Sequence, residues 1–435
     1  MTLWPPLNLQ DSRAFVELLR FVPWVVFLEL PYYLLVALGL IRYVMHKVHV
    51  PHKMPTGRPK VSCVITCYSE GEDVKKTIKS LAFQLYDGEI EIIPVIDGAV
   101  RNRDTYRAAL EMEEMVKSLP GRTLRVLPKW QRGGRVSSLN AGLNAAEGAV
   151  VMALDGDTSF DNDMVLKAVR HFADPNVAAL AGCLRVRNWR ASPVAALQGL
   201  EYLLSILTAK TGLSQFNTVN NISGAFGVFR REILELVLGW DSGSAEDLDL
   251  TMRIKNYFGR NPGMRIVFDP EVMGHTDVPD TLRGFLKQRL RWDGDLFYIY
   301  VRKHLKSFSP SLMGWRNFLV TLVGGFYFQI ITPLMLLVYT CFSFLTLSLG
   351  KVLYVFLWIY LFYLGVTVFF YLAAMLCLTE RPRDDIRFLP LIPIFPAFTF
   401  MCRLWSAFAI LWEIAAQGHR DSSMAPWWVL RRGKF

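Results

Sequence analysis

Apolar residues gather in blocks toward the two ends of this chain, with a long mixed region between them. The first block runs from about Phe21 to Val44, and three more follow Arg316: Phe318–Leu349, Val352–Leu378 and Phe388–Ala416. Each block is long enough to cross a bilayer, which takes about 20 residues. At face value the pattern predicts four membrane spans around a water-facing region.

The mixed region, from about residue 53 to residue 309, alternates short β-rich runs with helix-compatible stretches. An alternation of strands and helices of this kind favours a parallel sheet. The ligand site of such a sheet lies beyond the carboxyl ends of its strands. We therefore divide the chain into an N-terminal segment (1–52), a cytosolic catalytic domain (53–309) and a C-terminal membrane region (310–435). The predicted strands are Val61–Tyr68, Glu91–Ile96, Leu124–Leu127 and Ala149–Leu154, and the first helices are Asp73–Leu85 and Asp104–Leu119.

Two stretches of the mixed region combine large apolar residues with charged ones at helical spacing. They are Pro193–Phe216 and Thr281–His304. The spacing is typical of helices that lie on the inner surface of a membrane, and ordinary amphipathic helices of a soluble domain are the alternative. The second stretch leads directly into the membrane region, which favours the interface.

The formal net charge of +10 suits an anionic ligand or an anionic membrane surface. No basic stripe interleaved with aromatic residues is present, so nucleic acid is not an expected partner. Cations follow the first apolar block, and the positive-inside rule then places the catalytic domain in the cytosol of a multi-pass protein of the plasma (inner) membrane. These cations are Arg42, Lys47, Lys53, Arg58 and Lys60.

The last apolar block does not fit this orientation simply. Counting four spans puts the tail, with Arg431, Arg432 and Lys434, outside, which the charge rule disfavours. Because Pro390 and Pro396 interrupt the block, a re-entrant or double segment is the alternative.

Three ionisable residues inside the apolar blocks need an explanation. Glu29 is read as a carboxyl near one interface, with a partner in the helix bundle as the alternative. Arg403 and Glu413 are expected to face a bundle interior, a polar pathway or an interface.

Carboxylates follow two of the predicted strands. Asp97 comes directly after Glu91–Ile96, where it could accept a hydrogen bond from a uracil N–H or a ribose hydroxyl, although Asp-Gly is also a common turn. Asp155 and Asp157 end the apolar run Gly148–Leu154. Breaking the glycosidic bond of a sugar nucleotide requires neutralised phosphates, which a carboxylate-bound Mg²⁺ or Mn²⁺ provides. A surface loop is the alternative, and the buried pattern of the preceding run argues against it.

Two later motifs carry further chemistry. The run Ser244–Asp249 opens a helical stretch with three carboxylates, any one of which could simply cap a helix. An inverting transfer needs a base that removes the proton of the acceptor hydroxyl, and Asp247 is predicted to be that base. In Gln288–Trp292, the Gln and two Arg could bind a diphosphate and the Trp could stack on a sugar, with a basic amphipathic helix as the alternative.

In this order and between apolar blocks, the motifs resemble those of the processive family 2 glycosyltransferases. These include cellulose, hyaluronan and chitin synthases, and the layout is most similar to nodulation chitooligosaccharide synthase and bacterial poly-N-acetylglucosamine synthase. The resemblance covers about Val61 to Trp292, although Thr66 and Ser69 stand where the family usually has Pro and Asn. It implies an α/β fold: a GT-A glycosyltransferase domain with a mostly parallel sheet, inserted between transmembrane helices and carrying interface helices.

The resemblance also implies roles at the matching positions. Asp247 would be the catalytic base and Asp157 the metal ligand, with His275 either a third ligand or a structural histidine. Arg135, in place of the family's Lys, would contact phosphate, and Ser223–Gly227 would form the acceptor-side loop. The other implied substrate-binding residues are Tyr68 and Asp97 for uridine, Asp155 for the nucleotide, Glu246, Gln288, Arg289 and Arg291 around the diphosphate, and Trp292 for the acceptor sugar.

The expected protein is thus a membrane-embedded inverting hexosyltransferase. It would transfer a sugar from a UDP-sugar, UDP-N-acetylglucosamine or UDP-glucose, to a growing β-linked polysaccharide acceptor and help to translocate the polymer. Membrane lipids and an accessory membrane subunit are the further partners considered. The alternative is a non-processive enzyme with a membrane lipid acceptor, similar to ceramide glucosyltransferase. A pure transporter or scaffold would not need Asp155, Asp157, Asp247 and Trp292 together.

Overall fold

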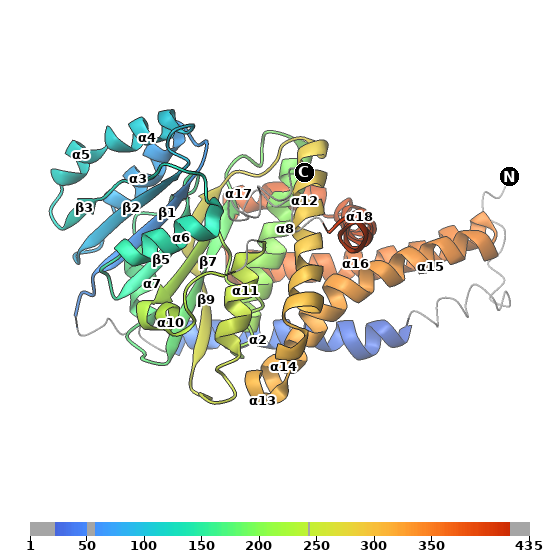
Figure 1. Cartoon of the computed structure of the whole chain (residues 1–435). Helices are drawn as coiled ribbons and strands as arrows, with labels where there is room; N and C mark the ends of the chain where they lie inside the picture. The colour runs from blue at the N-terminus through green and yellow to red at the C-terminus, as the bar shows by residue number, and fades with distance from the viewer. Residues whose placement is uncertain (1–21, 50–56, 242–243, 418–435) are drawn as a thin grey trace.

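The structure is a computed structural model, and it describes residues 22–49, 57–241 and 244–417. The strands lie at one end of the molecule, and α15 (Thr332–Thr346) reaches out at the other (Figure 1). Two parts are therefore distinct, a sheet with its covering helices and a set of long apolar helices, as the distribution of polar residues predicted.

The sheet has nine strands in the order β3-β2-β1-β5-β8-β7-β9-β6, with β4 also paired to β2. β1, β2 and β5 are parallel neighbours, whereas β8 runs antiparallel between β5 and β7. The predicted strands Val61–Tyr68, Glu91–Ile96 and Ala149–Leu154 are confirmed, whereas the predicted Leu124–Leu127 falls on the break between the short strands β3 and β4. The reversal at β8 is a feature that the sequence pattern did not predict. The bounds are β1 Val61–Cys67, β2 Ile90–Asp97, β3 Arg122–Leu124, β4 Leu127–Lys129, β5 Val150–Asp155, β6 Ser159–Phe160, β7 Val177–Val186, β8 Phe226–Arg230 and β9 Arg265–Thr276.

Helices cover both faces of this sheet, which explains why every residue of β1 and β2 is buried. Close packing is visible at Gly142 of α6, where an added Cβ would lie 2.2 Å from the side chain of Val64. The helices are α3 Asp73–Ala82, α4 Arg103–Leu110, α5 Glu113–Lys117, α6 Gly134–Ala145, α7 Met164–His171, α10 Arg231–Leu236 and α11 Glu246–Lys255.

The two predicted amphipathic stretches are helical. The first comprises α8 (Pro193–Tyr202), a π-helical segment and α9 (Lys210–Ser214), and the second comprises α12 (Leu282–Phe297) and the π-helical segment Tyr298–Lys303. Each begins with an N-cap hydroxyl: Ser192 accepts a hydrogen bond from the Ala195 N–H, and Thr281 accepts one from the Gly284 N–H. Their position on a membrane surface stays a prediction.

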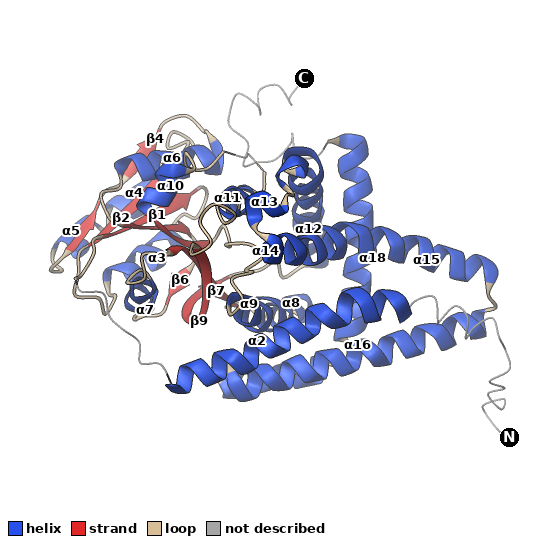
Figure 2. Cartoon of the chain, turned by 90° about the horizontal axis from the view of Figure 1, so that it is seen from below, coloured by secondary structure: helices blue, strands red, loops and turns tan. Residues whose placement is uncertain are grey.

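Four helices in the described ranges are long and apolar enough to cross a membrane. The four spans are Val22–Lys47, Trp315–Thr346, Leu349–Cys377 and Phe395–Ala416. The first includes most of α2 (Leu30–His49), and the second includes α14 (Trp315–Thr321) and α15. The third is α16 (Leu349–Cys377) and the fourth is α18 (Phe395–Ala416). Figure 2 shows α2 and α16 side by side.

The last apolar block is divided by its prolines. Pro390 lies inside a short 3₁₀ helix, Ile386–Leu391, and Pro396 lies in the first turn of α18. The continuous helix therefore begins only at Phe395. The basic tail around Arg431 lies outside the described residues.

The ionisable residues of the apolar blocks make specific contacts. Glu29 is 4% exposed and accepts a hydrogen bond from the Tyr363 hydroxyl of α16 at 2.9 Å, so the bundle-partner alternative is correct. Arg403 of α18 donates to the Phe328 carbonyl at 2.7 Å, and the Glu413 carboxylate lies 3.6 Å from the Arg302 guanidinium. These charges hold helices to one another rather than facing lipid.

The loop between α16 and α18 is attached to the catalytic domain. Arg381 donates to both carboxylate oxygens of Asp161, at 2.9 and 3.0 Å, and Asp385 at the end of α17 (Pro382–Asp385) pairs with Arg185 of β7. The C-terminal end of α16 therefore lies on the same side as the sheet.

α2 meets the catalytic domain backbone to backbone. A Cβ added at Gly39 of α2 would lie 2.1 Å from the carbonyl oxygen of Gly212 in α9, and one added at Gly212 would lie 2.4 Å from the Val36 carbonyl oxygen. Only glycine permits two backbones to approach so closely. α2 is thus an integral part of the domain as well as a candidate span.

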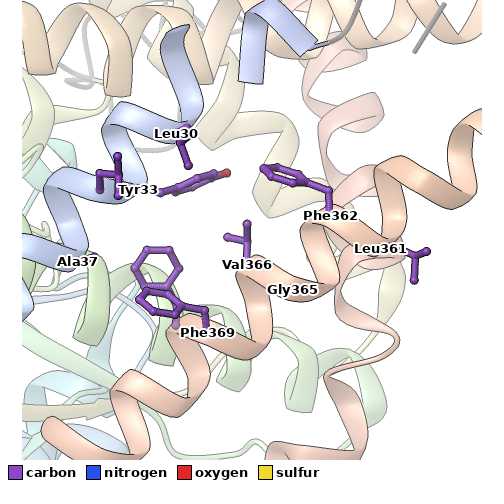
Figure 3. A pocket seen from close by; sticks show the side chains of 10 residues that line it. Leu30, Tyr33, Ala37, Leu361, Phe362, Gly365, Val366 and Phe369 are labelled. Atoms are coloured by element: carbon purple, nitrogen blue, oxygen red, sulfur yellow. The ribbon is translucent and has the colours of Figure 1, made fainter. Parts of the chain in front are cut away.

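An apolar groove of about 440 Å³ runs between α2 and α16. Figure 3 shows Tyr33 of α2 and Phe362 of α16 pointing toward each other across it. The remaining lining residues are Leu30, Leu34, Ala37, Leu361, Gly365, Val366, Phe369 and Phe370.

Candidate active site

Asp97 lies at the carboxyl end of β2 and holds the start of α6. Its carboxylate accepts hydrogen bonds from the backbone N–H groups of Gly133 and Gly134, at 2.8 and 2.9 Å, and from the Lys129 ammonium at 2.8 Å. A carboxylate offers about four acceptor positions, so these bonds leave one for a ligand. The predicted contact of Asp97 with uridine remains a prediction.

A pocket of about 590 Å³ opens next to this strand end. The Arg132 guanidinium covers the Tyr68 ring, 4.1 Å from its centroid, and Trp130 is 61% exposed. A planar base could be held by such aromatic and guanidinium faces. The pocket contains the predicted Tyr68, whereas sequence reasoning missed Trp130 and Arg132 because no strand or helix pattern marks their segment. Its lining is Tyr68, Gly98, Val100, Arg101, Trp130, Gln131 and Arg132.

Three carboxylates meet where β5 ends. Asp155 is the last residue of β5, and Asp157 follows it at the surface. Glu70 approaches from the loop after β1: a Cβ on Gly156 would lie 3.0 Å from its Cγ, and its Oε2 is buried without a hydrogen-bond partner among the described residues. Glu70 was quoted in the opening motif but was not predicted as a site residue.

The electrostatics of this cluster fit a bound cation. Burial, with the neighbouring carboxylates adding to it, raises the pKa of Glu70 to about 7. Although part of the Asp157 side chain is exposed, desolvation by the surrounding protein, followed by the Asp155 charge, raises its pKa to about 6. A hard divalent cation bound to these oxygens would remove the mutual repulsion.

The described residues contain no group of three or more His, Cys, Asp or Glu side chains that could hold a metal by themselves. Mg²⁺ is usually bound through one or two carboxylates, with the remaining ligands from substrate phosphates and water, so a third protein ligand is not required. His275 pairs with Asp161, 2.9 Å away, and Asp161 also binds Arg381, which is the structural role.

Arg135 joins the two acidic motifs. It lies in the first turn of α6, where its guanidinium contacts the carboxylates of Asp155 and, at 2.5 Å, Glu246. It also donates to the Gly224 carbonyl at 2.6 Å and the Thr66 hydroxyl at 2.9 Å. The residue predicted to contact phosphate is therefore inside the site, between carboxylates that are far apart in sequence.

The three carboxylates at the start of α11 have different environments. Asp249 is fully buried, and Arg253, Lys303 and His304 each approach it to 2.8 Å, which holds its pKa well below its usual range. Glu246 is paired with Arg135.

Asp247 is different, because no cation within the described residues lies at ion-pair distance from it. Its carboxylate accepts hydrogen bonds from the backbone N–H groups of Leu248 at 2.7 Å and Gly224 at 3.1 Å. Of the three carboxylates it is thus the one that can accept a proton without breaking an ion pair. Its contact with Gly224 places it beside the predicted acceptor-side loop.

The last motif lies on α12. Arg289 pairs with Glu201 of α8, and its guanidinium lies 5.3 Å from the ring centroid of Trp292. Gln288 has a buried Oε1 without a partner among the described residues. Asp295, one turn after Arg291, hydrogen-bonds Ser244 and lies close enough to Glu246 for their charges to interact, which brings this motif to the start of α11. Arg289 is paired with Glu201 of α8, and the diphosphate roles of Gln288, Arg289 and Arg291 stay predictions.

A family model for glycosyl transferase family group 2 matches residues 150–378, just over half of the chain. The chain belongs to this family. The glycosyltransferase is 29% identical over 234 residues to poly-beta-1,6-N-acetyl-D-glucosamine synthases from Staphylococcus aureus (strain COL) and Staphylococcus epidermidis. The match covers 53% of the chain and 53% of each synthase, so the chain spans about half the length of the curated relatives it matches.

The fold of this glycosyltransferase is also that of a solved GT-A enzyme. The mannosyltransferase PcManGT from Pyrobaculum calidifontis, in complex with GDP-Man and Mn2+, aligns with a TM-score of 0.53 and 18% sequence identity. The alignment covers 92% of this chain and 99% of that one. The predicted GT-A-type fold and the enzyme class, a glycosyltransferase flanked by apolar helices, are both confirmed.

Proposed function

We propose that this glycosyltransferase is an inverting polysaccharide synthase that uses a UDP-sugar, with UDP-N-acetylglucosamine the first choice. The observation that supports it best is the Arg135 bridge, which joins Asp155, the predicted nucleotide carboxylate at the end of β5, to Glu246, the residue before the predicted base Asp247 in α11. The printed name of the curated relatives favours N-acetylglucosamine. UDP-glucose is the second donor to test.

The proposed reaction uses groups on two sides of the sugar. The pocket beside Tyr68 would hold the uracil ring, and Gln288 and Arg291 would hold the diphosphate. Asp157 would bind the Mg²⁺ or Mn²⁺ that neutralises the phosphates when the donor is present. Asp247 would accept the proton of the acceptor hydroxyl as its oxygen attacks the anomeric carbon and the bond to UDP breaks, which gives a β-linkage by inversion.

We place the catalytic domain in the cytosol of a multi-pass membrane protein. The cations that follow α2 support this orientation. The attachment of the α16–α18 loop to the domain supports it too, because α15 and α16 then leave the domain side and return to it. The proposal includes passage of the polymer into or across the membrane.

The decisive experiment incubates the purified full-length protein in lipid nanodiscs with labelled UDP-N-acetylglucosamine or UDP-glucose and Mn²⁺ or Mg²⁺. A high-molecular-weight product that a matching β-glycoside hydrolase degrades is the expected result. A product that partitions into organic solvent as one glycolipid species would instead assign the chain to the lipid glycosyltransferases.

The base is tested with Asp247→Asn, which keeps the size and hydrogen-bonding shape of the side chain. We expect turnover to fall by at least about 10²-fold, the range for loss of a general base, while UDP binding stays within twofold. Asp104→Asn on α4, whose side chain is 87% exposed, is the matched control and should keep full activity. Wild-type turnover by Asp247→Asn would exclude Asp247 as the base.

A further inference from the structure

Lys210, the first residue of α9, is a buried cation close to the predicted base. It is 5% exposed, and its ammonium donates a hydrogen bond to the Asn221 carbonyl at 3.0 Å. No carboxylate within the described residues lies at ion-pair distance from it. An ammonium in such a site is costly unless a nearby anion compensates for the lost water. The anion that faces it is the Asp247 carboxylate, and the Cys183 thiol of β7 also faces it.

The Asn221 carbonyl belongs to a strap, residues 221–224, that wraps around Asp247. The Gly224 N–H donates to Asp247 Oδ2 at 3.1 Å, and the Asn221 amide approaches the same oxygen at 3.5 Å. The strap is also bound to α11, since the Ile222 N–H donates a hydrogen bond to the Thr251 hydroxyl at 3.0 Å. Lys210 thus holds the strap at its first residue, Asn221.

We propose that Lys210 is a positioning residue for Asp247. Its ammonium fixes the strap that orients the carboxylate for the proton of the acceptor hydroxyl. This inference rests on the proposed function, because it needs Asp247 to act as the base.

The proposal has a pH signature. Burial lowers the pKa of Lys210 to about 8, even though the Asp247 charge opposes this shift. Three groups are close enough to Asp247 for their charges to interact with it: Lys210, the neighbouring Glu246 and the Tyr300 hydroxyl that follows α12. Lys210 is the cation among these three. Arg135 also lies nearby, at the Gly224 carbonyl, but it is held in its two ion pairs. Below pH about 8 Lys210 is charged and its hydrogen bond to the Asn221 carbonyl is charge-assisted. Above that pH the charge is lost, the hold on the strap weakens and activity should fall.

The test measures initial rates of UDP release by the full-length protein in nanodiscs between pH 5.5 and 9.5. Lys210→Gln removes the charge and keeps a hydrogen-bond donor, whereas Lys210→Arg keeps both. We expect Lys210→Gln to lower kcat about 10-fold or more with donor KM within twofold. The loss of activity near pH 8 should disappear in this variant, because the group that titrates there is gone. Lys210→Arg should recover most of the kcat and move the alkaline limb above pH 9.

Lys255→Met is the matched control. Lys255 is also buried, at 1% exposure, but its ammonium contacts the Thr321 hydroxyl at 3.4 Å and does not face Asp247. Its substitution should leave both pH limbs in place, whatever it does to stability. Lys210→Gln with wild-type kcat and limbs would overturn the proposal, as would equal losses in both Lys210 variants with unmoved limbs. Absence of wild-type turnover would instead count against the proposed function, so the two failures are distinguishable.

Discussion

The contact between Gly39 and Gly212 gives the most direct structural prediction. Gly39→Ala would place a methyl carbon 2.1 Å from the Gly212 carbonyl oxygen. Ordinary contact requires more than 3 Å, so α2 and α9 must separate by roughly 1 Å along a buried seam. The new Cβ is attached directly to the backbone of α2, and the oxygen that it meets belongs to the backbone of α9. No side-chain rotation can therefore relieve the clash.

Overpacking of this kind costs about 1–3 kcal/mol, and the better helix propensity of Ala returns up to about 1 kcal/mol. We therefore expect a net destabilisation of about 1–2 kcal/mol. For a domain of this size that corresponds to roughly 2–8 °C in Tm. Gly212→Ala should behave similarly, because its Cβ would lie 2.4 Å from the Val36 carbonyl oxygen.

The assay compares thermal unfolding of the detergent-solubilised proteins at one scan rate, together with residual UDP release after heating. Gly365→Ala is the matched control, because α16 leaves nothing within 4 Å of an added Cβ there, and its Tm should stay unchanged or rise. The losses of stability caused by the Gly39 and Gly212 substitutions should be less than additive in the double variant, since either substitution alone already separates the two backbones. Equal Tm values for Gly39→Ala and Gly365→Ala would refute the reasoning.

Three further predictions concern charge. Arg135→Lys should fold but lower kcat/KM about 10-fold or more, because a single ammonium cannot replace the guanidinium that contacts Asp155, Glu246 and the Gly224 carbonyl together; steady-state kinetics check this. Chelation with EDTA should abolish transfer, added Mn²⁺ should restore it, and Asp157→Asn should raise the half-saturating Mn²⁺ concentration several-fold in a metal titration. Glu29→Leu should destabilise the protein by about 1 kcal/mol, because the Tyr363 hydroxyl loses its acceptor, whereas Glu29→Gln should retain most stability in the same thermal assay.

The elements of the catalytic domain were predictable where local pattern decides them. β1, β2 and β5 read as apolar runs because both faces of the parallel part of the sheet are covered. The second half was not predicted: β8 pairs antiparallel with β5 and β7 because long-range topology, rather than composition, sets its direction. α6, whose first turn contains Arg135, was not among the predicted helices, and the Asp97 carboxylate at the end of β2 holds its start.

The residue types of the site were readable in the sequence, but their pairing was not. Arg135 was predicted to meet phosphate, and no sequence spacing indicates that it spans Asp155 and Glu246. Glu29 was assigned to an interface. Its role as acceptor for Tyr363 could not be read from the sequence, because that residue lies on a helix more than three hundred residues later. Lys210 carried no motif at all, and only its burial beside the strap makes it notable.

The close approach of α2 to α9 also has a consequence for biosynthesis. α2 leaves the ribosome about 170 residues before α9, since Gly39 and Gly212 are that far apart along the chain. Domains fold as their chain emerges, N-terminal parts first. In a nascent chain α2 would therefore be present before α9 is made. α2 would then act as a template on which the catalytic domain closes. A catalytic domain expressed without α2 would lack one wall of its core beside α9, so it should be less stable than a fragment that retains residues 22–49.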